Sequence, residues 1–328
     1  MAAEPAFCSA NFTPIHLRTV LAGTALDAGS DAVVAAALAV ARAAGARLHV
    51  LHAVEMPLVP SFPDTPWITA EVLAEDAADR GQELAAQLER LGAADDEARA
   101  SLVHGAAHRA LLDAARDLEA DLIVAGAART EGPLEKLLGT TADRLLRKAT
   151  CPLLVVRGEL PVPPARVAAP VDLASLSADA LRSGLHLLAQ IGAGIRTRVI
   201  VFHALTFLGH LALRHRTEPM ASDEEAERAA RAALASLAAA CAEGLPMTIE
   251  TRLRCGDPRV EILAELEESR PDLVVMGTHS RRPLDRLLLG SIAATLAHRA
   301  PCSLLVVPPE AALGEGIAAA VAAAAAEV

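Results

Sequence analysis

Two glycines and two serines at fixed spacing form the part of this sequence best suited to chemistry. Residues 277–280 read Gly-Thr-His-Ser, nine residues follow, and Gly290 and Ser291 come next. A glycine at the end of an apolar strand lets the backbone approach a phosphate closely. A later glycine and hydroxyl residue that open a helix offer free amide N–H groups, an OH and the positive end of the helix. The spacing therefore predicts an anion-binding loop.

The same pattern occurs earlier in the chain. Residues 126–129 read Gly-Ala-Ala-Arg, and nine residues later come Gly139 and Thr140, 151 positions before Gly290 and Ser291. His52, Asp121 and Cys151 recur at the same offset as His203, Asp272 and Cys302. A constant offset over this length indicates two copies of one domain. We expect domains at residues 15–158 and 165–308, followed by an alanine-rich tail at 309–328.

The bulk properties narrow the class of protein. A chain of 328 residues is long enough for two domains, each with its own core. The formal charge of −11 disfavours nucleic acid as a partner, because such binding needs a concentrated basic face. Apolar runs stay below the length of a membrane span and the N-terminus lacks the features of a signal peptide, so we expect a cytoplasmic protein that does not bind membranes. Cys151 and Cys302 adjoin apolar strands, so we expect their side chains to be small buried hydrophobic groups rather than nucleophiles.

Apolar strands alternate with helical stretches throughout both copies. In the first copy we expect strands at 17–22, 47–54, 99–103, 122–125 and 152–156, and helices ending near 44 and spanning about 67–91, 106–118 and 140–148. In the second copy we expect strands at 166–171, 198–204, 247–254, 273–276 and 303–307, and helices starting near 178 and 291 and spanning 223–242 and 259–268. This alternation predicts an α/β fold with a parallel sheet covered by helices on both faces.

With these motifs in order, the chain resembles a tandem universal stress protein. Besides the glycine loops, it has the strand end Val167-Ala-Ala-Pro-Val-Asp172 and the terminal strands Cys151-Pro-Leu-Leu-Val-Val156 and Cys302-Ser-Leu-Leu-Val-Val307. The resemblance covers about residues 15–308. It implies two doubly wound, mostly parallel five-stranded domains of the adenine nucleotide alpha hydrolase-like type. They would pack as an internal pseudo-dimer, paired through the strands at 152–156 and 303–307.

The resemblance also implies a ligand, ATP or AMP with or without Mg²⁺. It places Asp172 and Ala204 at the nucleoside and surrounds the phosphates with Met276, Gly277, Ser280, Gly290, Ser291 and Ile292. Arg281, in the same loop, either steers phosphates electrostatically or is simply solvated. The plainer alternatives stay open as well: the two glycines could serve a tight turn and a helix start, and Asp172 could cap the next helix.

The two copies differ where the ligand would bind. Arg129 stands where the second copy has Ser280, and it would cross the space that a phosphate needs. Ala25 stands where the second copy has Asp172. Asp27 either substitutes for that carboxylate or caps the following helix. We therefore predict that the second half keeps the nucleotide site and that the first half has largely lost it.

Motifs for catalysis are missing from the sequence. It has no G-x-S-x-G, no HExxH and no complete P-loop, so we expect a binding protein rather than an enzyme, with slow ATP hydrolysis left open. His52 and His203 lie at equivalent ends of the second strand of each copy, and we expect both to have structural rather than catalytic roles. The sequence favours a nucleotide-binding stress regulator acting through an unknown protein partner. The alternative is a nucleotide-free scaffold of the same family, and further association into a homodimer stays open.

Overall fold

The computed structural model describes residues 12–55, 70–94, 96–127, 138–173, 175–206, 223–278 and 290–308. The strands of the first half are β1 (Thr19–Thr24), β2 (Arg47–Val54), β3 (Ala98–His104), β4 (Leu122–Gly126) and β5 (Leu153–Val156), and those of the second are β6 (Arg166–Pro170), β7 (Arg198–Leu205), β8 (Thr248–Cys255), β9 (Leu273–Gly277) and β10 (Ser303–Val307). The helices are α1 (Ala28–Ala44), α2 (Ala70–Arg90), α3 (Ala107–Asp117), α4 (Thr140–Lys148), α5 (Ser175–Gln190), α7 (Asp223–Cys241), α8 (Pro258–Ser269) and α9 (Ser291–Arg299). The alternation predicted from the sequence is confirmed.

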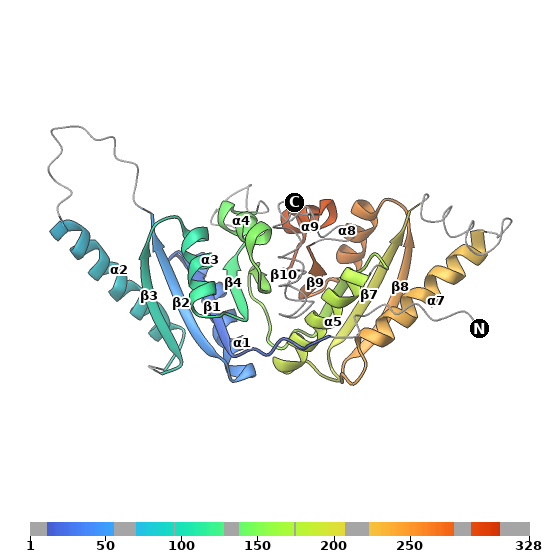
Figure 1. Cartoon of the computed structure of the whole chain (residues 1–328), viewed down its shortest axis with the longest axis horizontal. Helices are drawn as coiled ribbons and strands as arrows, with labels where there is room; N and C mark the ends of the chain where they lie inside the picture. The colour runs from blue at the N-terminus through green and yellow to red at the C-terminus, as the bar shows by residue number, and fades with distance from the viewer. Residues whose placement is uncertain are drawn as a thin grey trace, which may run out of the picture.

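All ten strands form one continuous sheet (Figure 1). Its order is β3-β2-β1-β4-β5-β10-β9-β6-β7-β8, so each half has the same doubly wound order and the halves meet at β5 and β10. Pairing is parallel within each half, whereas β5 and β10 pair antiparallel, with Leu154 opposite Leu305. The terminal strands expected to join the halves therefore do so, and this junction leaves neither β5 nor β10 as a free sheet edge.

Helices cover both faces of the sheet and bury a separate core on each. One core lies under α1, α2, α5 and α7, and the other lies under α3, α4, α8 and α9. Successive side chains of a strand point to opposite faces. Along β1, Val20 and Ala22 accordingly enter the first core while Leu21 enters the second. Burial on both faces explains why the strands read as continuous apolar runs rather than alternating ones.

The repeated aspartates have a structural role at the sheet end opposite the glycine loops. Asp121 Oδ2 accepts hydrogen bonds from the backbone N–H groups of Arg18 and Thr19, at 2.8 and 2.9 Å. Asp272 Oδ2 does the same for Ala165 and Arg166, at 2.9 and 2.8 Å. Each carboxylate therefore satisfies the donors at the start of β1 or β6, and its recurrence reflects strand pairing rather than ligand chemistry.

The chain before β1 lies against a helix of the other half. Leu17 N–H donates to Gln190 Oε1 at 2.8 Å, and Gln190 Nε2 donates to the Ile15 carbonyl at 2.6 Å. The guanidinium carbon of Arg182 lies 4.2 Å from the centre of the Phe12 ring, a cation–π contact. These contacts tie the entry to β1 onto α5.

The main differences from the expected elements lie near β1. The strand expected at 17–22 runs from Thr19 to Thr24, because Gly23 and Thr24 continue the ladder opposite Leu51 and His52 of β2. The connection between β1 and α1 is short, since α1 begins at Ala28. The proline-rich residues 56–66 and the alanine-rich tail expected at 309–328 lie outside the described residues. None of the helices that the structure describes is long and apolar enough to cross a membrane.

Candidate functional site

The strand order reverses once in each half. In the first half β1 lies between β2 and β4, and in the second β6 lies between β7 and β9. The helices that follow β1 and β4 cover opposite faces of the sheet, so a crevice opens at the carboxyl ends of these two strands. The loops at these two crevices are where ligands bind in open α/β sheets.

In the second half, several predicted residues meet at this crevice. Asp172 follows the end of β6, and its backbone N–H donates to Ser177 Oγ in the first turns of α5 at 3.3 Å. Met276 and Gly277 end β9, the neighbouring strand, and Ala204 lies near the end of β7. The structure therefore brings the predicted nucleoside and strand-end residues to one edge of the sheet.

Gly290 occupies a position that a side chain would disturb. Its N–H donates to the Thr278 carbonyl at 3.1 Å, and a Cβ added to it would lie 2.9 Å from the same oxygen. Gly290 is also the N-cap of α9, without a side-chain capping bond, and its carbonyl accepts the first helical hydrogen bond, from Ala294 N–H at 2.8 Å. The close contact holds the start of α9, with Ser291 and Ile292, beside the end of β9.

Other predicted residues fall outside what the structure describes. Ser280 and Arg281 lie within 279–289, and Arg129 lies within 128–137. The expected steric difference between Arg129 and Ser280 stays a prediction. So does the proposed retention of the nucleotide site by the second half.

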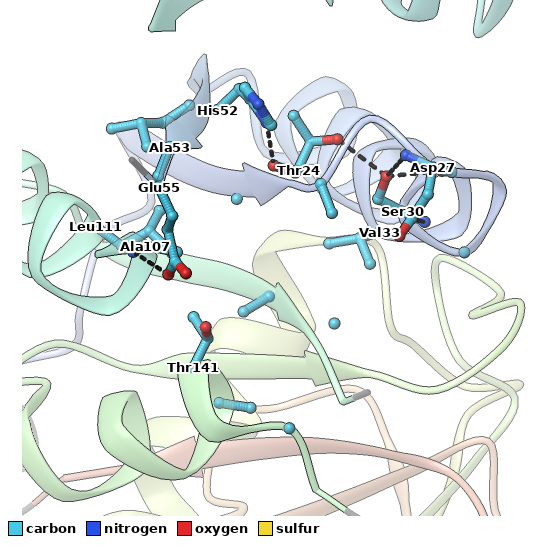
Figure 2. A pocket seen from close by; sticks show the side chains of 18 of the residues that line it. Thr24, Asp27, Ser30, Val33, His52, Ala53, Glu55, Ala107, Leu111 and Thr141 are labelled. Atoms are coloured by element: carbon cyan, nitrogen blue, oxygen red, sulfur yellow. Dashed lines mark hydrogen bonds between the residues drawn. The ribbon is translucent and has the colours of Figure 1, made fainter. Parts of the chain in front are cut away.

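The first half contains a cavity of about 580 Å³ at the equivalent crevice (Figure 2). It is bordered by the loop from β1 to α1, the end of β2, and the first turns of α3 and α4. Ala25, which replaces the expected aspartate, lines it together with Ala53, Leu111 and Gly139. The sequence predicted a degenerate nucleotide site here and did not predict a ligand-sized cavity.

A polar network supports the wall of this cavity from behind. Thr24 Oγ1 lies 3.0 Å from Ser30 Oγ and 2.9 Å from Gln87 Oε1, and Gln87 Nε2 donates to Asp31 Oδ1 at 2.7 Å. Burial raises the pKa of Asp31, but hydrogen bonds from Gln87 and Arg90 outweigh it and hold the pKa below its ordinary value. A buried, satisfied network of this kind fixes the loop from β1 to α1 against α2.

Two positions of this network are apolar in the second half. Val171 stands where the first half has Thr24, and Ala238 stands where it has Gln87. Both side chains are buried. The support behind the first crevice is therefore more polar than that behind the second, where Ser177 keeps the hydroxyl of Ser30.

Asp27 is a helix cap. Its Oδ1 accepts from Ser30 N–H at 2.9 Å, and Ser30 Oγ accepts in return from Asp27 N–H at 3.1 Å, which completes a capping box at the start of α1. The capping alternative left open by the sequence is confirmed, although the side chain still borders the cavity.

The two equivalent histidines each bind a strand-end carbonyl. His52 Nδ1 lies 3.0 Å from the Thr24 carbonyl, and His203 Nδ1 lies 2.7 Å from the Val171 carbonyl. Each ring therefore links the ends of two neighbouring strands at the crevice. This geometry supports the structural role expected for both histidines.

The equivalent cysteines are also structural. Burial raises the pKa of both Cys151 and Cys302 to about 12, so both stay protonated thiols near neutral pH and are poor nucleophiles. Within the described residues there is also no group of His, Cys, Asp and Glu side chains arranged to hold a metal ion.

His108 makes the stability of the first half sensitive to acid. Burial, followed by the charges of Arg144, Arg109 and Lys148, lowers the pKa of His108 below its ordinary value of 6.5. The unfolded chain therefore takes up a proton before the folded one does as the pH falls. The contribution of neutral His108 to the free energy of unfolding is therefore complete above about pH 6.5, and it is lost as the pH drops toward the pKa of the folded state.

We expect the free energy of unfolding of the wild type to fall between pH 7.5 and 5.5 by more than that of His108→Gln, with a difference of at most about 1.4 kcal/mol per pH unit. Urea denaturation at the two pH values measures this. Equal losses in both proteins would show that His108 titrates alike in the folded and unfolded states.

Comparisons with known proteins agree with this architecture. The model of the universal stress protein family matches residues 16–157 and again 165–308. A universal stress protein of Methanocaldococcus jannaschii is 41% identical over 66 residues, which span 20% of this chain and 39% of that relative. The solved structure of a universal stress protein from Archaeoglobus fulgidus shares the fold, with a TM-score of 0.61 at 18% identity over 89% of this chain and 98% of its own.

A third comparison aligns with about one half of the chain. A universal stress protein solved in complex with cAMP covers 44% of this chain and 99% of its own, at 24% identity and a TM-score of 0.34. The two family matches, the repeated strand order and the shared fold have one explanation. The chain belongs to the universal stress protein family and carries two copies of its domain in tandem.

Proposed function

We propose that this protein is a regulatory adenine-nucleotide-binding protein that takes ATP or AMP chiefly in its second half. The observation that carries phosphate binding is the contact of Gly290 with the Thr278 carbonyl, and the preference for the second half rests on Asp172, where the first half has Ala25. It holds the start of α9, which has no side-chain cap, next to the strand end at Gly277. Helix starts with unsatisfied N–H groups bind phosphates well, because donors and helix dipole act together.

The other predicted residues have compatible positions. Asp172 would accept hydrogen bonds from the nucleoside, beside Ala204 at the end of β7, while Ser291 and Ile292 would face the phosphates from the first turn of α9. Met276 and Gly277 would form the floor between them, and Ser280 and Arg281 would complete the loop. A universal stress protein has been solved with cAMP, and the proposal takes adenine nucleotides as the ligand class.

The proposal is a binding function without catalysis. Occupancy of the second half would change which protein partner the chain recognises, in the cytoplasm. The sequence supplies no lysine in the glycine loop of the second half to stabilise charge on a transferred phosphoryl group. We therefore expect nucleotide turnover to stay at the level of a denatured control.

Thermal denaturation with ATP and AMP tests the proposal. Ligand at about 100 times its dissociation constant should stabilise the fold by about 2.7 kcal/mol. Asp172→Asn should reduce this shift, whereas Asp27→Asn, the matched change in the first half, should leave it in place. An absence of any shift at millimolar nucleotide would contradict the proposal and favour the scaffold alternative, as would ATP density confined to the first half after soaking crystals.

A further inference from the structure

We infer that the cavity of the first half binds a neutral or cationic molecule of nucleoside size and selects against phosphorylated ligands. Glu55 makes this difference, since it places a carboxylate at the mouth of the cavity at a position where the second half has Thr206. The inference concerns the first half and does not depend on the nucleotide site proposed for the second.

The size and lining of the cavity suit a compact, largely apolar ligand. Its volume of about 580 Å³ falls within the range of roughly 300 to 1,000 Å³ typical of small-molecule sites. Small and aliphatic side chains make up much of its wall, among them Val33, Leu51, Ala53, Leu111 and Leu138. Thr140 and Thr141, at the start of α4, add neutral hydroxyl groups.

The charges around the cavity favour the same class of ligand. Two carboxylates, Asp27 and Glu55, are among the lining residues. Arg80, the cation among the described lining residues, pairs with Asp76 at 3.2 Å. Among the described lining residues, the start of α4 offers a phosphate open N–H groups, because its N-cap Gly139 makes no side-chain capping bond. A phosphate there would also lie near the two carboxylates, and Arg80 is already paired, so the carboxylates oppose this attraction.

A hydrogen bond to the start of α3 holds Glu55 in this position. Its Oε1 accepts a hydrogen bond from Ala107 N–H at 3.3 Å, at the start of α3. Figure 2 shows the side chain reaching from the end of β2 toward Ala107, on the side that faces Thr141. Glu55 therefore occupies an N–H donor of α3 that would otherwise be available to an anion.

In the second half, the equivalent helix α8 is capped by a different residue. There Asp257, the N-cap residue of α8, accepts from Arg259 N–H at 2.8 Å. The equivalent residue of the first half is Ala106, which makes no side-chain capping bond. In the first half, the carboxylate that caps the helix therefore comes from Glu55, after β2 and beside the cavity, rather than from the N-cap residue.

A double variant can return the capping carboxylate of the first half to the N-cap position. The double variant Glu55→Thr with Ala106→Asp gives the first half the arrangement of the second and keeps a cap on α3. Isothermal titration with adenosine, AMP and benzamidine, which are a neutral, an anionic and a cationic probe, measures the selectivity. All titrations use the Gly290→Asp background, so that the loop of the second half does not contribute.

We expect adenosine or benzamidine to bind this protein, and AMP to bind about tenfold more weakly than adenosine, which corresponds to about 1.4 kcal/mol. The double variant should bring AMP close to parity with adenosine and weaken benzamidine. Failure of both adenosine and benzamidine to bind at millimolar concentration would overturn the inference. So would an AMP affinity that equals that of adenosine, or a preference for adenosine that the double variant leaves unchanged.

These outcomes differ from a failure of the proposed function. If the second half bound no nucleotide, the wild type and Gly290→Asp would show the same thermal shift with ATP. The selectivity of the first half would still be measured as described. Each half is therefore tested by its own variants in the full chain.

Discussion

Replacing Glu265 with alanine is expected to lower the free energy of unfolding by about 3 kcal/mol, the lower end of the cost of breaking a buried ion pair. The Glu265 side chain is completely buried between two arginines of β8. Its Oε1 lies 2.8 Å from Arg252 Nη1, and its Oε2 lies 2.7 Å from Arg254 Nε. The variant would remove one partner from each guanidinium group, while Arg252 would keep Glu250 at 2.7 Å and Arg254 would keep Glu268. About a quarter of each arginine side chain is exposed, which lets water relieve part of the cost.

Glu268→Ala is the matched control. Glu268 contacts the same two arginines, but 62% of its side chain is exposed, so we expect a loss below about 1 kcal/mol. Urea denaturation followed by circular dichroism measures both variants. If the two variants lost the same stability, burial would not be what makes the Glu265 pairs important.

Gly290→Ala is expected to weaken ATP binding by roughly 10- to 100-fold, the loss of one hydrogen bond to a charged group. The added Cβ would lie 2.9 Å from the Thr278 carbonyl, so the start of α9 must move away from the end of β9. Backbone cannot yield here as the tip of a flexible side chain could. The first-turn N–H groups would then lose their alignment with the phosphates. Isothermal titration of wild type and variant with ATP gives the ratio of dissociation constants.

Gly194→Ala controls for the loss of a glycine as such. A Cβ at Gly194 would have the Gly192 carbonyl oxygen at 4.0 Å as its neighbour, which is ordinary contact, and its backbone does not need a positive φ. We expect its ATP affinity to match that of the wild type. An affinity of Gly290→Ala equal to that of Gly194→Ala would remove Gly290 from the proposed site.

Comparison of the expected and observed elements shows which features are local. The strands at 47–54 and 303–307 and the helix at 140–148 have the predicted bounds. Each is specified by a run of apolar residues or by a glycine and threonine that open a helix, features that neighbours in the sequence supply. The end of β1 was missed because Thr24 belongs to the strand through its pairing with His52, 28 residues away.

By itself, the sequence determined the duplication, the α/β alternation and the family, because repeats, apolar periodicity and glycine spacing are all written along the chain. The resemblance also identified β5 and β10 as the junction between the halves, which their antiparallel pairing confirms. These features need no knowledge of which distant residues meet.

The tertiary structure alone decided what the first half offers a ligand. Its cavity depends on Gln87 reaching Thr24 across 63 positions and on Glu55 reaching Ala107 across 52. The substitution of Ala25 for an aspartate suggested a lost site, but the sequence could not show that a carboxylate from another strand would stand at the opening. Long-range side-chain contacts of this kind form only when the fold closes, and they carry no periodic signal in the sequence.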